Sequence, residues 1–195
     1  MNLIVLFYLH FKKYLKKRFL LIKMNCRQNW SNECETELNK QISREYSASL
    51  SYHILSSFFD RDDVGLNKLR DYFAKSSLEE REHADKLMRY QQMRGGVASL
   101  GQVTPKQFME CLNDRKNDIL GAFMFALELE KEINGHLLNL HGVASQNNDP
   151  QFSDYLEGEF LKEQVEAISE LSKIISVLQR FDGDQHAIWN YVESL

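Results

Sequence analysis

The chain has 195 residues, of which 43% are hydrophobic and 27% are charged, a size and balance typical of one folded domain with a substantial core. It contains only 2 prolines and 9 glycines, and it has no run of short alternating segments separated by turns. These features disfavour an all-β fold. The sequence therefore predicts a single all-α domain.

Charge is distributed unevenly along the chain. Residues 1–24 hold six basic side chains and no acidic one, so the rest of the chain has 18 of the 24 basic residues but all 28 acidic residues. An acidic domain favours metal cations or solubility, and it disfavours nucleic acid as a partner. No DNA-binding or RNA-binding motif is present, and we expect no nucleic-acid partner.

The N-terminal segment 1–24 is interpreted as separate from the domain, which we place at residues 25–195. Its apolar run, 3–9, is too short to span a bilayer. Its basic cluster follows that run, whereas a signal peptide carries its charge first. We interpret the segment as a dispensable or non-native extension, with unusual targeting or an amphipathic membrane contact as alternatives. No stable membrane insertion is expected.

The three cysteines indicate a compartment. Cys26, Cys34 and Cys111 are an odd number without a CxxC spacing, which suits reduced thiols and supports neither a disulfide framework nor a zinc site. The sequence therefore predicts a cytoplasmic protein, with secretion as a weaker alternative.

Four long stripes of mainly apolar or small residues recur at alternating spacings of four and three, as expected for helices that pack in a bundle. Each stripe has a polar residue near its middle. The stripes are Leu38, Ile42, Glu45, Ser49, Tyr52, Ser56, Phe59; Leu69, Phe73, Ser76, Glu80, His83, Leu87, Tyr90; Ile119, Phe123, Ala126, Glu130, Ile133, Leu137, Leu140; and Phe160, Gln164, Ala167, Leu171, Ile174, Leu178.

The connections between the stripes predict the topology. Asp60–Gly65 and Asn147–Pro150 are short polar turns, so each joins two antiparallel neighbours. Arg94–Gly96 ends the second helix, and Thr104–Pro105 is expected to begin the third as an N-cap followed by proline. The residues between them form a crossover, and Gln185–Leu195 reads as a short terminal helix. The predicted fold is a four-helix bundle with one long crossover and a short fifth helix.

The polar residues of the four stripes fall at nearly one height along the bundle. Measured from the middle of the adjoining turn, each lies 17 to 20 residues away: Glu45, Glu80, His83, Glu130 and Gln164. With a rise of about 1.5 Å per residue, these side chains reach a common level. One shared internal site is therefore predicted.

This site has the composition of a metal centre. Glu45, Glu80 and Glu130 would place about three negative charges in the interior, where each unpaired charge costs several kcal/mol, and no stripe offers Lys or Arg. Two divalent cations would neutralise that charge. Carboxylates with one imidazole suit iron or manganese, and Glu80 and His83 are spaced to point at one ion.

Taken singly, each polar residue has a simpler interpretation. A stripe glutamate is more often a rim residue that reaches water, and a stripe histidine is usually a hydrogen-bonded core residue. Tyr52 is by default core packing, although a phenol near a redox metal also donates a hydrogen bond or an electron. Glu79, Glu82 and Asp85 read as a solvated helix face. However, all four stripes have a polar residue at the same height, and this coincidence favours one shared site over four unrelated polar residues.

Several motifs closely resemble the animal heavy-chain type of ferritin, from about residue 25 to the C-terminus. They are Phe59–Val64, Glu79–Ala84, Lys86–Met88, Arg94–Gly96, Leu129–Lys131 and Glu163–Val165. The Glu-x-x-His spacing of Glu80 and His83 is the one found in the di-iron carboxylate proteins built on helix bundles. The resemblance implies that two irons bind at Glu45, Glu80, His83 and Glu130, with Glu80 bridging them and Gln164 and Tyr52 acting nearby.

The same resemblance implies a wider iron pathway. Glu79, Glu82 and Asp85 match cavity-facing positions that collect Fe(III) and seed mineral, while Asp154 and Glu157 match acidic threefold channels that attract Fe(II). A cage of 24 subunits, with or without other ferritin chains, is expected from likeness alone. The expected activity is a ferroxidase that oxidises Fe(II) with O₂ and stores ferric mineral. The alternative is a passive storage subunit without its own oxidation site.

Overall fold

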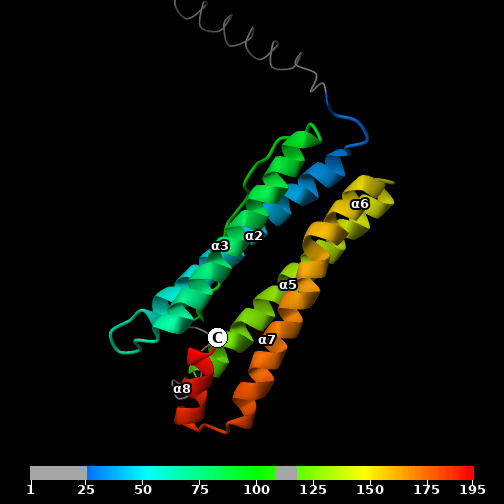
Figure 1. Cartoon of the computed structure of the whole chain (residues 1–195). Coiled ribbons are helices and arrows are strands. Elements are labelled where there is room, and N and C mark those ends of the chain that lie inside the picture. Colours follow the sequence, from blue (N-terminus) through cyan, green and yellow to red (C-terminus); the bar gives the residue numbers. More distant parts are fainter. Residues whose placement is uncertain (1–25, 109–117) are drawn as a thin grey trace, which may run out of the picture.

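The computed structural model describes residues 26–108 and 118–195, and within these ranges the chain is helical and contains no strand. Two antiparallel helix pairs form a bundle, with a short helix at one end (Figure 1). The elements are α2 (Asn32–Phe59), α3 (Asn67–Met93), α5 (Asp118–Gln146), α6 (Pro150–Leu156), the π-helix η2 (Glu157–Leu161), α7 (Lys162–Arg180) and α8 (Gln185–Glu193). The predicted all-α bundle with a short C-terminal helix is confirmed.

The two predicted turns lie where the sequence indicated. Gly65, between α2 and α3, has a φ of +63°, which glycine adopts without strain. Asp149 caps α6, because its side chain accepts a hydrogen bond from the Phe152 N–H at 3.0 Å, and Pro150 follows as the first helical residue. α6, η2 and α7 then continue as one rod that packs against α5 (Figure 1).

The apolar core consists of two clusters, one toward each end of the bundle. One contains Phe59, Phe73 and Phe123, and the other contains Leu38 and Leu87. On three helices the predicted polar residue falls between neighbours that belong to different clusters: Glu80 between Phe73 and Ala84, Glu130 between Leu129 and Ile133, and Gln164 between Phe160 and Leu171. The predicted polar level therefore lies between the two apolar clusters.

The crossover after α3 runs extended along α2, and the prediction that Thr104 and Pro105 begin the third helix is wrong. The Thr104 N–H donates to Ser47 Oγ at 3.1 Å, and the Lys106 N–H donates to Ser51 Oγ at 2.8 Å. These amides bind α2, and the backbone becomes helical only at Phe108. Cys111 lies outside the described residues, which resume at Asp118.

Every fourth residue of α2 contributes to this attachment, so the contacts form one ridge along the helix. Glu35 Oε1 accepts a hydrogen bond from the Val97 N–H at 2.8 Å, and Ser43 Oγ accepts one from the Gly101 N–H at 2.9 Å. The Asn39 amide accepts from the Ser99 N–H and donates to the Val97 carbonyl, both at 3.0 Å. With Ser47 and Ser51, these residues are called the α2 ridge.

Replacing Ser43, Ser47 and Ser51 together by alanine should lower the free energy of unfolding by about 2 to 3 kcal/mol. Each hydroxyl accepts one crossover N–H, and a hydrogen bond contributes about 1 kcal/mol to stability. Urea unfolding measures the difference, with Ser57→Ala as an exposed control on the same helix. Equal stability of the triple variant and the control would show that the ridge does not hold the crossover.

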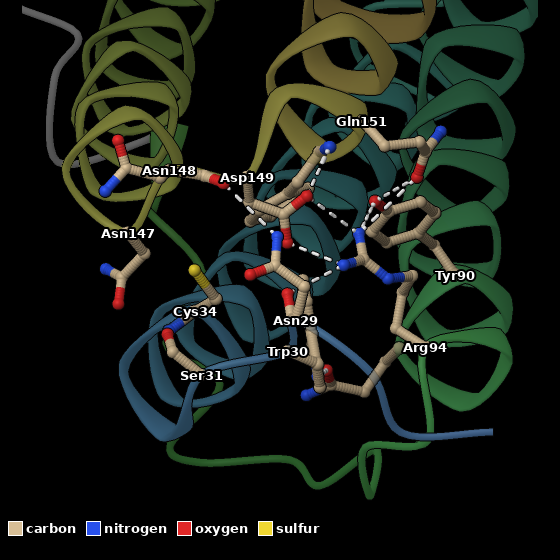
Figure 2. A network of polar contacts seen from close by, with 12 residues as sticks. Asn29, Trp30, Ser31, Cys34, Tyr90, Arg94, Asn147, Asn148, Asp149 and Gln151 are labelled. Atoms are coloured by element: carbon tan, nitrogen blue, oxygen red, sulfur yellow. Dashed lines mark hydrogen bonds and ion pairs between the residues drawn. The ribbon is translucent and has the colours of Figure 1, made fainter.

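A second polar network, the Arg94 clamp, lies at the end of the bundle where α3 finishes, and consists of Asn29, Tyr90, Arg94, Asp149 and Gln151 (Figure 2). The Arg94 guanidinium donates to both oxygens of the Asp149 carboxylate, at 3.2 and 2.6 Å, and to the Asn29 carbonyl at 2.9 Å. The Tyr90 hydroxyl donates to Gln151 Oε1 at 2.6 Å. Because Asp149 is only 2% exposed, this ion pair is largely removed from water and joins α3 to the α5–α6 turn.

Candidate metal centre

Two helices bring Glu45, Glu80 and His83 to one point inside the bundle. One possible ligand atom from each side chain lies within 4.8 Å of the other two. Glu45 is fully buried and Glu80 is 4% exposed, while the His83 side chain is 15% exposed. Glu45 comes from α2, and the other two come from successive turns of α3.

The two oxygens of Glu45 have different surroundings. Oε1 accepts a hydrogen bond from Gln41 Nε2 at 2.8 Å, whereas Oε2 is buried and has no hydrogen-bond partner among the described residues. An unpartnered buried carboxylate oxygen is costly, and a cation beside it would remove that cost. The donor set around it, carboxylates with one imidazole, fits a hard divalent metal ion such as iron or manganese.

Glu130, from α5, is held by two neighbours. The Tyr52 hydroxyl donates to its Oε1 at 2.5 Å, and Gln164 Nε2 donates to its Oε2 at 2.9 Å. Both neighbours are buried, so Tyr52 and Gln164 fix the orientation of this carboxylate. The charge of Glu130 also raises the pKa of Glu80, and both side chains line the same cleft.

Burial raises the pKa of all three carboxyl groups. The pKa of Glu45 lies well above its usual value because of desolvation and then because of the charge of Glu80. Desolvation and the charge of Glu130 do the same to the pKa of Glu80, and desolvation raises that of Glu130. Without a cation the site therefore retains protons, and binding a metal ion releases them.

These shifts predict how the metal-free protein responds to pH. A carboxyl group whose pKa is raised by folding binds its proton more tightly in the native state, so its contribution to stability is lost as pH rises above the unfolded value of about 4.5. The Glu80→Gln protein should therefore gain stability relative to the native chain between about pH 5 and about pH 7. Urea unfolding in a chelator tests this, and a pH-independent difference would contradict it.

His83 is placed between two carboxylates. Its Nδ1 lies 3.4 Å from Glu80 Oε2, and its Nε2 lies 3.3 Å from Glu163 Oε2 on α7. Each ring nitrogen therefore faces a carboxylate, and Nδ1 is the nitrogen directed toward the buried cluster. Glu163 was not predicted as a site residue, because nothing in the sequence distinguishes it from an ordinary surface glutamate, and its side chain is indeed half exposed.

The π-helix η2 was also not predicted. A π turn accommodates an extra residue, and one extra residue rotates the helix that follows by about 100°. η2 ends at Leu161, three residues before Gln164, which faces Glu130. The sequence just before the fourth stripe contains Glu157, Gly158 and Glu159, and these residues do not distinguish a π turn from an α turn.

A cleft of about 610 Å³ leads from the surface to the buried cluster. It is lined by the site residues Tyr52, Glu80, His83, Glu130 and Gln164. Toward solvent its walls come mainly from α3 and α7, with five acidic residues and two lysines: Asp71, Glu79, Glu163, Glu166, Glu170, Lys68 and Lys75. An excess of acidic groups at an opening attracts cations.

The other predicted iron-binding residues lie nearer the surface. Glu79 is exposed and pairs with Lys75 at 3.2 Å, Glu82 is exposed, and Asp85 accepts a hydrogen bond from the Tyr46 hydroxyl at 3.1 Å. Asp154 and Glu157 are exposed, and Glu157 Oε1 lies 2.7 Å from His141 Nε2. None of these five acidic residues belongs to the buried Glu45, Glu80 and His83 cluster.

A helical bundle with converging carboxylates and a histidine at its centre defines the class of helix-bundle metal proteins. The profile of the ferritin-like domain matches residues 35–181. The chain belongs to the ferritin family, whose members bind iron.

Several plant ferritins are similar to this chain over most of its length. A chloroplastic ferritin of Malus baccata var. xiaojinensis is 47% identical over 171 residues, which cover 87% of this chain and 67% of that protein. Chloroplastic ferritin-1 of Nicotiana tabacum is 45% identical over 188 residues, covering 93% and 73%. Chloroplastic ferritin-3 of Glycine max is 46% identical over 169 residues, covering 87% and 65%. The chain thus spans about two thirds of the length of these relatives.

The similarity to plant ferritins bears on the predicted location and on the predicted type of ferritin. The predicted cytoplasmic location is wrong, because these relatives are named chloroplastic ferritins and reduced cysteines do not distinguish the two compartments. The ferritin family is confirmed, but the relatives are plant proteins and do not specify the animal heavy-chain type. Within residues 26–108 and 118–195, no helix is long and apolar enough to cross a membrane.

Proposed function

We propose that this chain is an iron-storage subunit that oxidises Fe(II) with O₂ at a centre formed by Glu45, Glu80, His83 and Glu130. The observation that carries the proposal is the buried Glu45 Oε2, which has no hydrogen-bond partner in the part of the chain that the structure describes. The Glu45 side chain converges there with Glu80 and His83. Family membership supports iron as the metal.

In this proposal Fe(II) is the substrate, and the chain supplies fixed ligands and an acidic approach. The cleft between α3 and α7 attracts the cations, and Fe(II) replaces the protons of the buried carboxyl groups. Two Fe(II) ions each give one electron to one O₂ molecule, which takes up two protons and leaves as hydrogen peroxide, so that 2 Fe(II) + O₂ + 2 H⁺ gives 2 Fe(III) + H₂O₂. Tyr52 and Gln164 hold Glu130 in place during this exchange.

Storage requires an assembly that retains the ferric product. We propose a cage of 24 subunits, as in the family that the sequence resembles, with Glu79, Glu82 and Asp85 collecting Fe(III) on the inner surface. Asp154 and Glu157 attract Fe(II) at channels between subunits. The relatives' names favour a plastid as the compartment, and immunodetection in fractionated cells of the source organism tests this location.

A passive storage subunit is the alternative function: its exposed acids would nucleate ferric mineral, and partner chains would carry out the oxidation. Stopped-flow absorbance of the purified apoprotein with two Fe(II) per chain and O₂ distinguishes the two. The proposal predicts a fast oxidation phase whose amplitude saturates near two Fe(II) per chain. Slow oxidation without such a phase, in a protein of cage size, would instead establish the passive role.

A further inference from the structure

Gln41 is a buried polar residue that lies one helical turn before Glu45 on α2. It is 0% exposed, and its amide contacts two charged side chains. Gln41 Nε2 donates to Glu45 Oε1 at 2.8 Å, and Gln41 Oε1 accepts a hydrogen bond from Arg44 Nη1 at 3.3 Å. A chain of hydrogen bonds therefore runs from a half-buried guanidinium to a buried carboxylate.

Arginine determines which way this amide points. The guanidinium has only donors, so it requires the oxygen of Gln41 on its side. The amide NH₂ must then face Glu45, where it donates to Oε1. The opposite orientation would place two donors against each other at Arg44 and two acceptors against each other at Glu45.

This arrangement leaves the two oxygens of Glu45 with different tasks. Oε1 is held by the amide, and Oε2 has no hydrogen-bond partner among residues 26–108 and 118–195. The side chain is thereby prevented from rotating to satisfy Oε2 at the expense of Oε1. Carboxylate ligands of metal ions are commonly held by such hydrogen bonds, whose loss weakens metal binding by about 10-fold to 100-fold.

We propose that Gln41 is a positioning residue that holds Glu45 with Oε2 free to bind a metal ion, and that Arg44 sets the orientation of the Gln41 amide. The inference rests on the proposed function. It gives a role to a residue outside the predicted ligand set.

Arg44 also connects this arrangement to a second cavity. A hollow of about 360 Å³ under the crossover is lined by Arg44, Lys106, Glu132 and His136. Lys106 Nζ lies 2.5 Å from Glu132 Oε2, so the Glu132 carboxylate in this cavity is already paired with a lysine. The Arg44 guanidinium donates instead to Gln41, which lies on its own helix.

The test is a double-mutant cycle in which the affinity of the apoprotein for Co(II) is measured. Co(II) is used in place of Fe(II), and oxygen is excluded so that the metal stays divalent. Gln41→Met keeps the length of the side chain but removes the donor, and it should weaken Co(II) binding at the buried site by about 10-fold to 100-fold. In a Glu45→Ala background the same substitution should change the affinity by less than about twofold, because Gln41 then has no ligand to position. Arg44→Met should weaken Co(II) binding, whereas Arg44→Lys, which keeps a charged donor for the Gln41 oxygen, should bind Co(II) like the native chain.

A control variant and melting temperatures separate the possible results. Gln92→Leu, an exposed glutamine on α3, should bind Co(II) like the native chain. The metal-free melting temperature of each variant shows whether it is folded, and the rise in melting temperature on adding Co(II) gives a second measure of affinity. If Gln41→Met bound as tightly as native, or lost equal affinity in the Glu45→Ala background, the positioning role would be overturned. If the native chain and Glu80→Ala bound Co(II) equally, the proposed metal centre itself would fail.

Discussion

Replacing Glu80 and His83 together by alanine is expected to slow Fe(II) oxidation by about 100-fold, equivalent to roughly 2.7 kcal/mol in the activation free energy. Both side chains belong to the buried cluster, and the substitution removes two of its three members. Of the proposed ligands only Glu45 and Glu130 remain, and these two carboxylates cannot hold a pair of ions in one geometry. Stopped-flow absorbance with two Fe(II) per chain measures the loss.

The same variant should remain folded. Glu80 is buried with a raised pKa, so its removal takes away a charge that the metal-free interior tolerates poorly. A matched control replaces an exposed histidine and an exposed glutamate of α8, His186→Ala with Glu193→Ala, and should oxidise iron like the native protein. Native-like oxidation by the Glu80 and His83 variant would remove the proposed centre, provided that its assembly and helicity match the control.

The second large effect concerns stability at the opposite end of the structure from α8. Arg94→Leu should lower the free energy of unfolding by about 3 to 5 kcal/mol, the usual cost of leaving one partner of a buried ion pair without its counter-charge. Asp149 would keep its place, because it caps α6, but it would lose two hydrogen bonds from the guanidinium. Urea unfolding of the metal-free protein measures the change.

An exposed arginine gives the comparison. Arg70 pairs with Asp60 at 3.1 Å on the surface, and Arg70→Leu should lower the free energy of unfolding far less than Arg94→Leu because water screens that pair. Similar losses for Arg94→Leu and Arg70→Leu would contradict the view that the Arg94 clamp is a buried structural element. A large loss confined to Arg94 would support it.

The main features of the fold could be predicted because the bundle repeats a simple rule. Each stripe residue near Glu45, such as Ile42 and Tyr52, is buried, and the polar residues at equal distance from a turn do meet. Helical rise is constant, so counting along two antiparallel helices is enough to compare heights. The same counting predicted Glu130 and Gln164 as neighbours, and a hydrogen bond joins them.

The features that were missed depend on side-chain contacts between distant segments. Proline after threonine is a common helix start, but the amides near Thr104 bind serines of α2 that are 55 and 57 residues away in sequence. Gln41 lies outside the stripe pattern, and its importance appears only when Arg44 and Glu45 are seen on either side of its amide. Periodicity indicates which face of a helix is buried, but it does not report such pairings.

The most direct test of the central claim is to locate the metal. Crystals of the native protein soaked without oxygen in Fe(II) should show two anomalous scattering peaks per chain inside the bundle, bound by Glu45, Glu80, His83 and Glu130. The Glu45 oxygen nearest to a peak should be Oε2, with Oε1 still bonded to Gln41. Peaks confined to exposed acids such as Glu82 and Glu157, with none inside the bundle, would contradict the account.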